Sequence, residues 1–130
     1  MSRFRNAAIL ALLLMSAPLA GLAASADYRF ELAGEPANNG TGTLVKLRLV
    51  GVADGKPVTG AEIVQTRLDM GPDGMAAMMA PVMPLPSAAP DIYSFEIRPT
   101  MPGNWGLTVT VKLPGEAAPI TGAVTIPVAK

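Results

Sequence analysis

The residues of this chain whose type and spacing could do chemistry are its methionines. The sequence has 130 residues and eight methionines, but no histidine and no cysteine. Five methionines fall between residues 69 and 90, and a sixth follows shortly after, giving the set Met70, Met75, Met78, Met79, Met83 and Met101. A thioether is a neutral, soft ligand. Roughly two to four converging sulfurs therefore select Cu(I), and by the same softness Ag(I), over Zn(II) or Mg(II).

Two interpretations of this methionine-rich segment are open. As a metal site, Met75, Met78 and Met79 are close enough in sequence to converge from one turn. The ligand set would be completed by Met70, Met83 or Met101. The absence of histidine favours this interpretation, because it removes the imidazole that Cu(II) prefers. Alternatively, the flexible side chains fill irregular gaps at one end of the fold, or offer an adaptable apolar contact to a partner.

The composition excludes most other chemistry. Without histidine or cysteine the chain has no Ser/His/Asp triad, no Cys/His pair, no zinc site of the usual type and no disulfide framework. Its 10 basic residues balance 10 acidic ones, which leaves no basic footprint for nucleic acid. Neither an imidazole nor a pair of carboxylates offers a base near neutral pH. We therefore expect neither an enzyme nor a nucleic-acid partner.

Apolar and polar residues alternate with a period of two along much of the chain, which is typical of half-buried β-strands. We expect strands over residues 28–32, 45–49, 61–68, 93–97, 105–113 and 120–128. The clearest alternation gives one apolar face made of Trp105, Leu107, Val109, Val111 and Leu113. A second sheet must cover that face. Together with turns rich in Gly, Pro and Asn, this pattern predicts an all-β fold, an immunoglobulin-like antiparallel β-sandwich of about seven short strands.

The stretch between residues 69 and 90 breaks this rhythm and is too long for a structureless loop in a compact domain. Prolines at positions 81, 84 and 86 allow only a short edge strand, expected over residues 80–85. Before it, residues 69–75 have the composition of two tight turns, in which Asp69 and Asp73 would bond the nearby backbone. We also expect an edge position for the last strand, because of Pro127, and a core position for Trp105.

The first 26 residues have the features of a secretion signal. Arg3 and Arg5 precede an uncharged apolar run, and Ala24, Ser25 and Ala26 form a small-residue cleavage site. This predicts a signal peptide over residues 1–26 and a single β-sandwich domain over residues 27–130, exported to the periplasm. The alternative is an uncleaved membrane anchor, because the charge-free run is at the lower limit for a span.

Three stretches resemble a known family. RLDMGPDGM at residues 67–75, YSFEI at 93–97 and MPGNWGLTVTV at 101–111 are similar to segments of the FixH-like or YtkA-like family of small periplasmic domains. The similarity covers about residues 40–113. Met70, Met75 and Met101 match methionine positions of the family, and Trp105 matches its tryptophan. The methionine cluster is more widely spaced here, and the histidines often found nearby are absent.

The resemblance implies an immunoglobulin-like sandwich associated with copper efflux, copper delivery or the maturation of respiratory oxidases. It also implies partners among exported metalloproteins or efflux components, with the membrane involved only if the signal segment stays uncleaved. We therefore expect a non-enzymatic periplasmic protein that binds Cu(I), or Ag(I) as a surrogate, through methionine thioethers. The alternative is a structural or interaction module whose methionine-rich loop, residues 69–90, docks on a larger exported complex.

Overall fold

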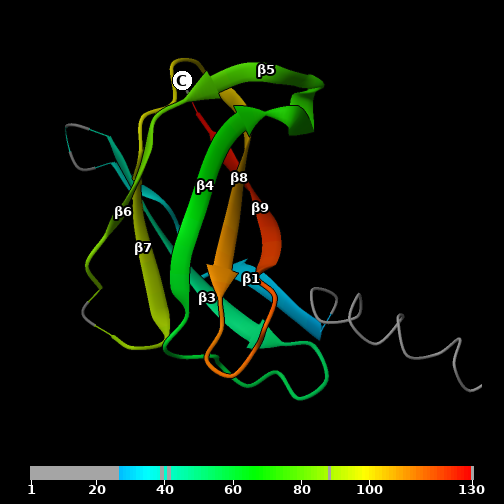
Figure 1. Cartoon of the computed structure of the whole chain (residues 1–130). Coiled ribbons are helices and arrows are strands. Elements are labelled where there is room, and N and C mark those ends of the chain that lie inside the picture. Colours follow the sequence, from blue (N-terminus) through cyan, green and yellow to red (C-terminus); the bar gives the residue numbers. More distant parts are fainter. Residues whose placement is uncertain (1–26, 39, 41, 88, 130) are drawn as a thin grey trace, which may run out of the picture.

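A computed structural model describes residues 27–38, 40, 42–87 and 89–129 (Figure 1). These residues form two antiparallel β-sheets that pack face to face, which confirms the predicted all-β, immunoglobulin-like sandwich. The predicted signal peptide, residues 1–26, lies outside the described part of the chain. Within the described part, no helix is long and apolar enough to cross a lipid bilayer.

The first sheet has the strand order β1-β3-β7-β6. Its strands are β1 (Tyr28–Leu32), β3 (Thr43–Gly51), β7 (Ile92–Ile97) and β6 (Val82–Leu85). A two-residue strand, β2 (Ala37–Asn38), also pairs with β3. The β6 strand lies at the edge of this sheet, as its prolines predicted.

The second sheet has the order β5-β4-β8-β9. Its strands are β5 (Met75–Ala80), β4 (Glu62–Met70), β8 (Gly103–Lys112) and β9 (Ile120–Val128). A short 3-10 turn, η3 (Gly71–Asp73), joins β4 to β5. The β9 strand is at the edge, as Pro127 predicted, and β5 forms the opposite edge.

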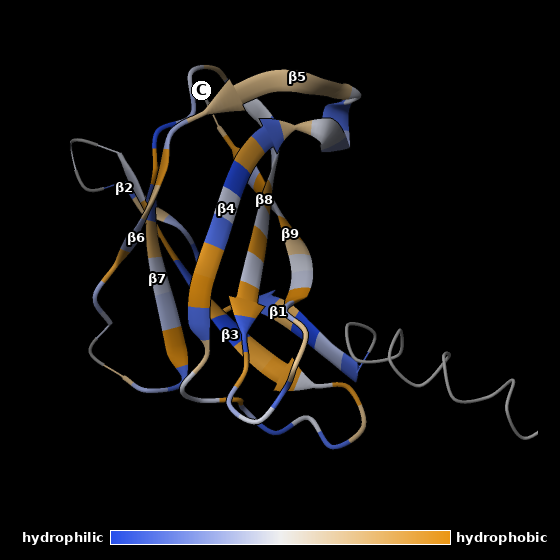
Figure 2. Cartoon of the chain, in the orientation of Figure 1, coloured by the Kyte–Doolittle hydropathy of each residue, from blue (hydrophilic) through white to orange (hydrophobic). Residues whose placement is uncertain are grey.

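The core lies between the inner faces of the two sheets. Because successive side chains of a strand point to opposite faces, the alternation along β8 buries every second residue (Figure 2). Four of these side chains have no exposed surface: Trp105, Leu107, Val109 and Val111. They belong to one hydrophobic core with the buried face of β3, formed by Val45, Leu47 and Leu49. The residues whose alternation predicted the sandwich therefore form its core.

The sequence did not predict two of the strands, β2 and β5. The β5 strand consists of methionine and alanine only, and Figure 2 shows it in one nearly uniform apolar colour. It therefore lacks both the alternation and the β-branched side chains by which strands are recognised. The segment predicted as a methionine-rich loop is instead largely strand.

Candidate metal centre

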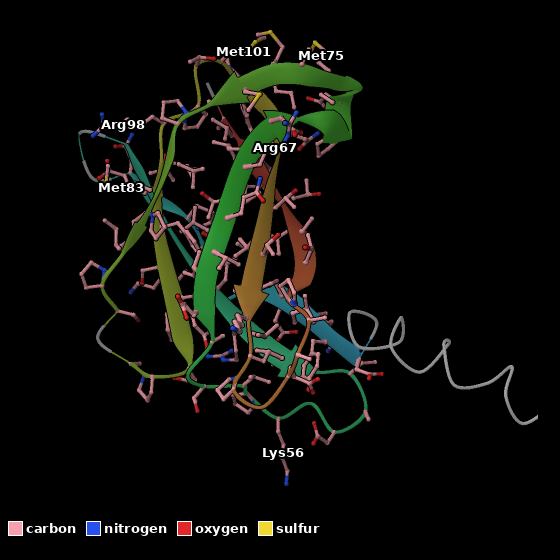
Figure 3. The ribbon with its side chains drawn as sticks, in the orientation of Figure 1. Lys56, Arg67, Met75, Met83, Arg98 and Met101 are labelled. Atoms are coloured by element: carbon pink, nitrogen blue, oxygen red, sulfur yellow. The ribbon has the colours of Figure 1, made fainter. Side chains whose placement is uncertain are left out.

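Four exposed methionines occupy one end of the sandwich. Met75, Met78 and Met79 belong to β5, which runs across the top of the molecule in Figure 1, and Met101 lies just before β8. Their exposed fractions are 40%, 41%, 56% and 40%, respectively. Figure 3 places Met75 and Met101 at this same end. We call this set of four residues the methionine cap.

The turn before β5 places Met75 at the corner of the sheet. Pro72 lies in the first turn of η3, and the N–H of Gly74 donates to the carbonyl of Gly71 at 2.8 Å. Gly74 has φ of +80°, a left-handed conformation that glycine adopts without a Cβ clash. The chain reverses here, so Met75 pairs with Met70 at the end of β4.

Asp73 and Asn104 join the two parts of the cap. The backbone N–H of Asn104 donates to one carboxylate oxygen of Asp73 at 2.8 Å, and the Asn104 side-chain amide donates to the other at 3.0 Å. These two hydrogen bonds, the backbone one foremost, lower the pKa of Asp73 below its ordinary value. Asp73 therefore bonds a residue 31 positions away rather than its own backbone, and holds the turn before Met75 against the start of β8, just after Met101.

Arg67 and Asp69 form a second link under β5. Arg67 Nε donates to Asp69 Oδ2 at 2.6 Å, and Arg67 Nη2 donates to the carbonyl of Ala76 in β5 at 3.0 Å. The other oxygen of Asp69 accepts the N–H of Gly71 at 2.8 Å, which confirms the predicted bond to the nearby backbone. The bond from Arg67, followed by that from Gly71, lowers the pKa of Asp69.

A bulge interrupts the pairing of β5 with β4, and both faces of β5 are exposed there. Met79 pairs with Asp69 and Met75 pairs with Met70, so residues 76–78 of β5 face no partner on β4. Bulges re-aim the side chains of a strand, and here residues 75–79 are all exposed instead of alternating. The bond from Arg67 satisfies the carbonyl of Ala76 within the bulge. All three β5 methionines are thus available to solvent.

Trp105 supports the loop that carries Met101. Its side chain is fully buried, as predicted, and its indole N–H donates to the carbonyl of Met101 at 3.0 Å. A buried indole needs such an acceptor, so the packing of the Trp105 ring also holds the loop in position. The core therefore fixes the backbone at Met101 while its thioether stays exposed.

The other two candidate ligands lie elsewhere. Met70 is 1% exposed and belongs to the core, with its methyl group against Gly103. Gly103 has φ of +142°, a backbone conformation that favours glycine, and a Cβ there would also come within 2.8 Å of Asp73 Oδ2. Met83 is exposed on β6 in the other sheet, opposite Glu96, and Figure 3 shows it away from Met75 and Met101.

Arg67, Asp69 and Asp73 are the charged side chains linked to the cap, and they do not form a cluster of hard metal ligands. Among the described residues, no group of three or more His, Cys, Asp or Glu side chains is placed to hold a metal ion. A groove of about 590 Å³ adjoins Gly103 and Asn104 and is lined mainly by apolar residues, including Leu32, Pro36 and Val128. Sequence reasoning missed Arg67, Asn104 and Gly103, because their roles depend on contacts between strands.

Searches of the curated proteins and of the solved structures found no match to this chain. A family model described as YtkA-like matches residues 22–110, which span β1 to most of β8. The match includes the turn before β5, the whole of β5 and the Met101 loop. The chain therefore belongs to the YtkA-like family.

Proposed function

We propose that this protein is an exported copper-handling protein that binds Cu(I), or Ag(I) as a surrogate, through the methionine cap. The observation that carries the proposal is the exposure of four thioethers at one end of the sandwich, on two segments joined by the Asp73–Asn104 hydrogen bonds. Burying a methionine side chain stabilises a fold by roughly 1.5–3 kcal/mol. The four cap methionines, which are 40–56% exposed, give up part of that stabilisation at one end of the sandwich.

The ligands in this proposal are Met75, Met78 and Met79, with Met101 completing the set. Their sulfurs are neutral and soft, so they favour a monovalent soft ion over Zn(II). Met70 supports the corner from within the core, and Met83 takes no part because it lies on the other sheet. The links through Arg67 and Asp73 orient β5 and the Met101 loop, which is the role that hydrogen bonds behind the ligands have in metal sites generally.

The open position of the cap favours transfer of the ion over storage. A donor set exposed at 40–56% leaves room for ligands of a second protein to reach the metal. Delivery of copper to an exported metalloprotein, or to an efflux component for copper tolerance, is the role that fits such a surface. Maturation of a respiratory oxidase is one form of that delivery.

The test is a triple variant, Met75→Leu, Met78→Leu and Met79→Leu. Leucine keeps volume and apolarity but removes sulfur, so we expect normal circular dichroism and an Ag(I) or Cu(I) affinity weakened by about tenfold or more. Affinity is measured by competition with a chelator of known strength. Met83→Leu is the matched control and should bind like the parent. Equal binding by the triple variant and the parent would contradict the proposal.

A second candidate function, an interaction module, is supported by the character of β5. Of the other outer strands, β6 and β9 contain Pro84 and Pro127, which hinder further strand pairing, and β1 carries Arg29 and Glu31, whereas β5 has neither proline nor charge. Exposed methionines also suit an adaptable apolar contact. In this case the triple leucine variant would still dock on its partner, while replacement of the same residues by glutamine would abolish docking.

A further inference from the structure

We propose that the methionine cap is also a modification site, at which hypochlorous acid or a related two-electron oxidant converts the exposed thioethers to methionine sulfoxide. We infer further that this modification switches off soft-metal binding, a consequence that rests on the function proposed above. The oxidation itself rests on the exposure of the side chains and on the composition of the chain.

The fold exposes the cap methionines and Met83 to an oxidant and shields Met70. Susceptibility of a thioether follows its exposure, and the cap residues are 40–56% exposed, whereas Met70 at the same corner is 1% exposed. The chain has no cysteine, whose thiolate would compete for the oxidant. Its single tryptophan, Trp105, is fully buried. The exposed methionines are therefore the most readily oxidised groups on the described surface.

The reaction is a net oxygen transfer to sulfur. The thioether sulfur loses two electrons and gains an S–O bond, while the O–Cl bond of hypochlorous acid breaks and releases chloride and a proton. The product is reversible by methionine sulfoxide reductases. One oxidant molecule is consumed for each methionine, so the number of cap methionines limits how many oxidant molecules the cap can consume.

Sulfoxidation changes the ligand without disturbing the core. One of the two sulfur lone pairs is used in the new S–O bond and the other becomes a weaker donor, while the sulfoxide oxygen is a hard donor that Cu(I) does not favour. Because the cap side chains are 40–56% exposed, water can solvate the sulfoxide and the added polarity costs the fold little. At Met70, by contrast, the same change would place a polar group in the core. Because Met70 is buried, oxidation of the exposed methionines can abolish metal binding without unfolding the protein.

The experiment treats the purified protein with increasing hypochlorous acid and follows each methionine by peptide mass spectrometry. We expect Met75, Met78, Met79, Met101 and the equally exposed Met83 to gain one oxygen at least about tenfold faster than Met70. In guanidinium chloride, Met70 should oxidise as fast as the others, since its protection comes from the fold. Equal rates in the native protein, or cap methionines that resist oxidation, would overturn the proposal.

Measuring Ag(I) affinity before and after oxidation distinguishes the two proposals. After oxidation limited to exposed methionines, Ag(I) affinity should fall by about tenfold or more while circular dichroism stays that of the parent. Bound Ag(I) should slow oxidation of the cap but not of Met83, which is the internal control. Unchanged Ag(I) affinity after full oxidation of the cap overturns the switch. Failure of the untreated protein to bind Ag(I) overturns both the proposed function and the switch. The proposal of a modification site is tested separately, by the pattern of oxidation alone.

Discussion

A thioether has no proton to lose, so metal binding by the methionine cap should be independent of pH over a wide range. The carboxylates closest in the hydrogen-bond network, Asp69 and Asp73, have a lowered pKa and stay ionised near neutrality. We expect the Ag(I) affinity to vary little between about pH 5 and pH 8, unlike that of a histidine or cysteine site. Zn(II) should not compete. Titrations at several pH values check this, and an affinity that rises steeply with pH would point to other ligands.

The same two carboxylates predict a loss of stability in acid. In the folded protein the pKa of each is below its ordinary value of 3.8, so the ionised form is favoured by folding. Their contribution is complete above that ordinary value and is lost as the pH falls through the folded pKa. Replacing Asp69 and Asp73 by asparagine should lower stability near neutral pH and flatten its decline below about pH 4. Urea unfolding across this range measures the effect, with Glu116→Gln, at an exposed carboxylate in the turn between β8 and β9, as the control.

At the residue scale, the sequence predicted the roles of single residues better than the contacts between distant residues. Trp105 is in the core and Asp69 bonds the following turn, because strand alternation and turn chemistry are local properties. Asp73 instead bonds Asn104, and Arg67 bonds Ala76 across the bulge. These partners could not be predicted, since they depend on the register between strands.

At the element scale, β8 gives the sharpest test of the sandwich. Leu107, Val109 and Val111 are fully buried on its inner face, so replacing each by alanine should destabilise the protein by about 1–4 kcal/mol. Thr110 lies on the outer face and shares a hydrogen bond with Thr121 of β9. Thr110→Ala should therefore cost much less, about 1 kcal/mol at most. Chemical denaturation measures the differences, and similar losses at both faces would contradict one-sided burial.

The sequence alone did not predict the β5 strand. Strands such as β3, β7 and β8 alternate apolar and polar residues because one of their faces is buried. The β5 strand buries neither face fully and pairs with β4 through a bulge, so its residues carry no such pattern. Its strand conformation comes from pairing with β4 and not from its own side chains.

At the scale of the whole molecule, the start of the mature chain remains a prediction. The predicted cleavage site after Ala26, just before β1 begins at Tyr28, makes Asp27 the expected first residue. Mass spectrometry of the protein recovered from the periplasm should find this N-terminus. An intact Met1 in the membrane fraction would show that the chain is anchored instead.

The strand order has a consequence for how the chain folds. Strands β1 to β3, with β6 and β7, make one sheet, while β4, β5, β8 and β9 make the other, so the chain crosses between the sheets three times. The central ladders, β3 with β7 and β4 with β8, each join segments far apart in sequence. Proteins dominated by such non-local pairings fold in roughly milliseconds to seconds. During that interval the uncharged edge of β5 is open to other unfolded chains, so refolding yield should fall as protein concentration rises.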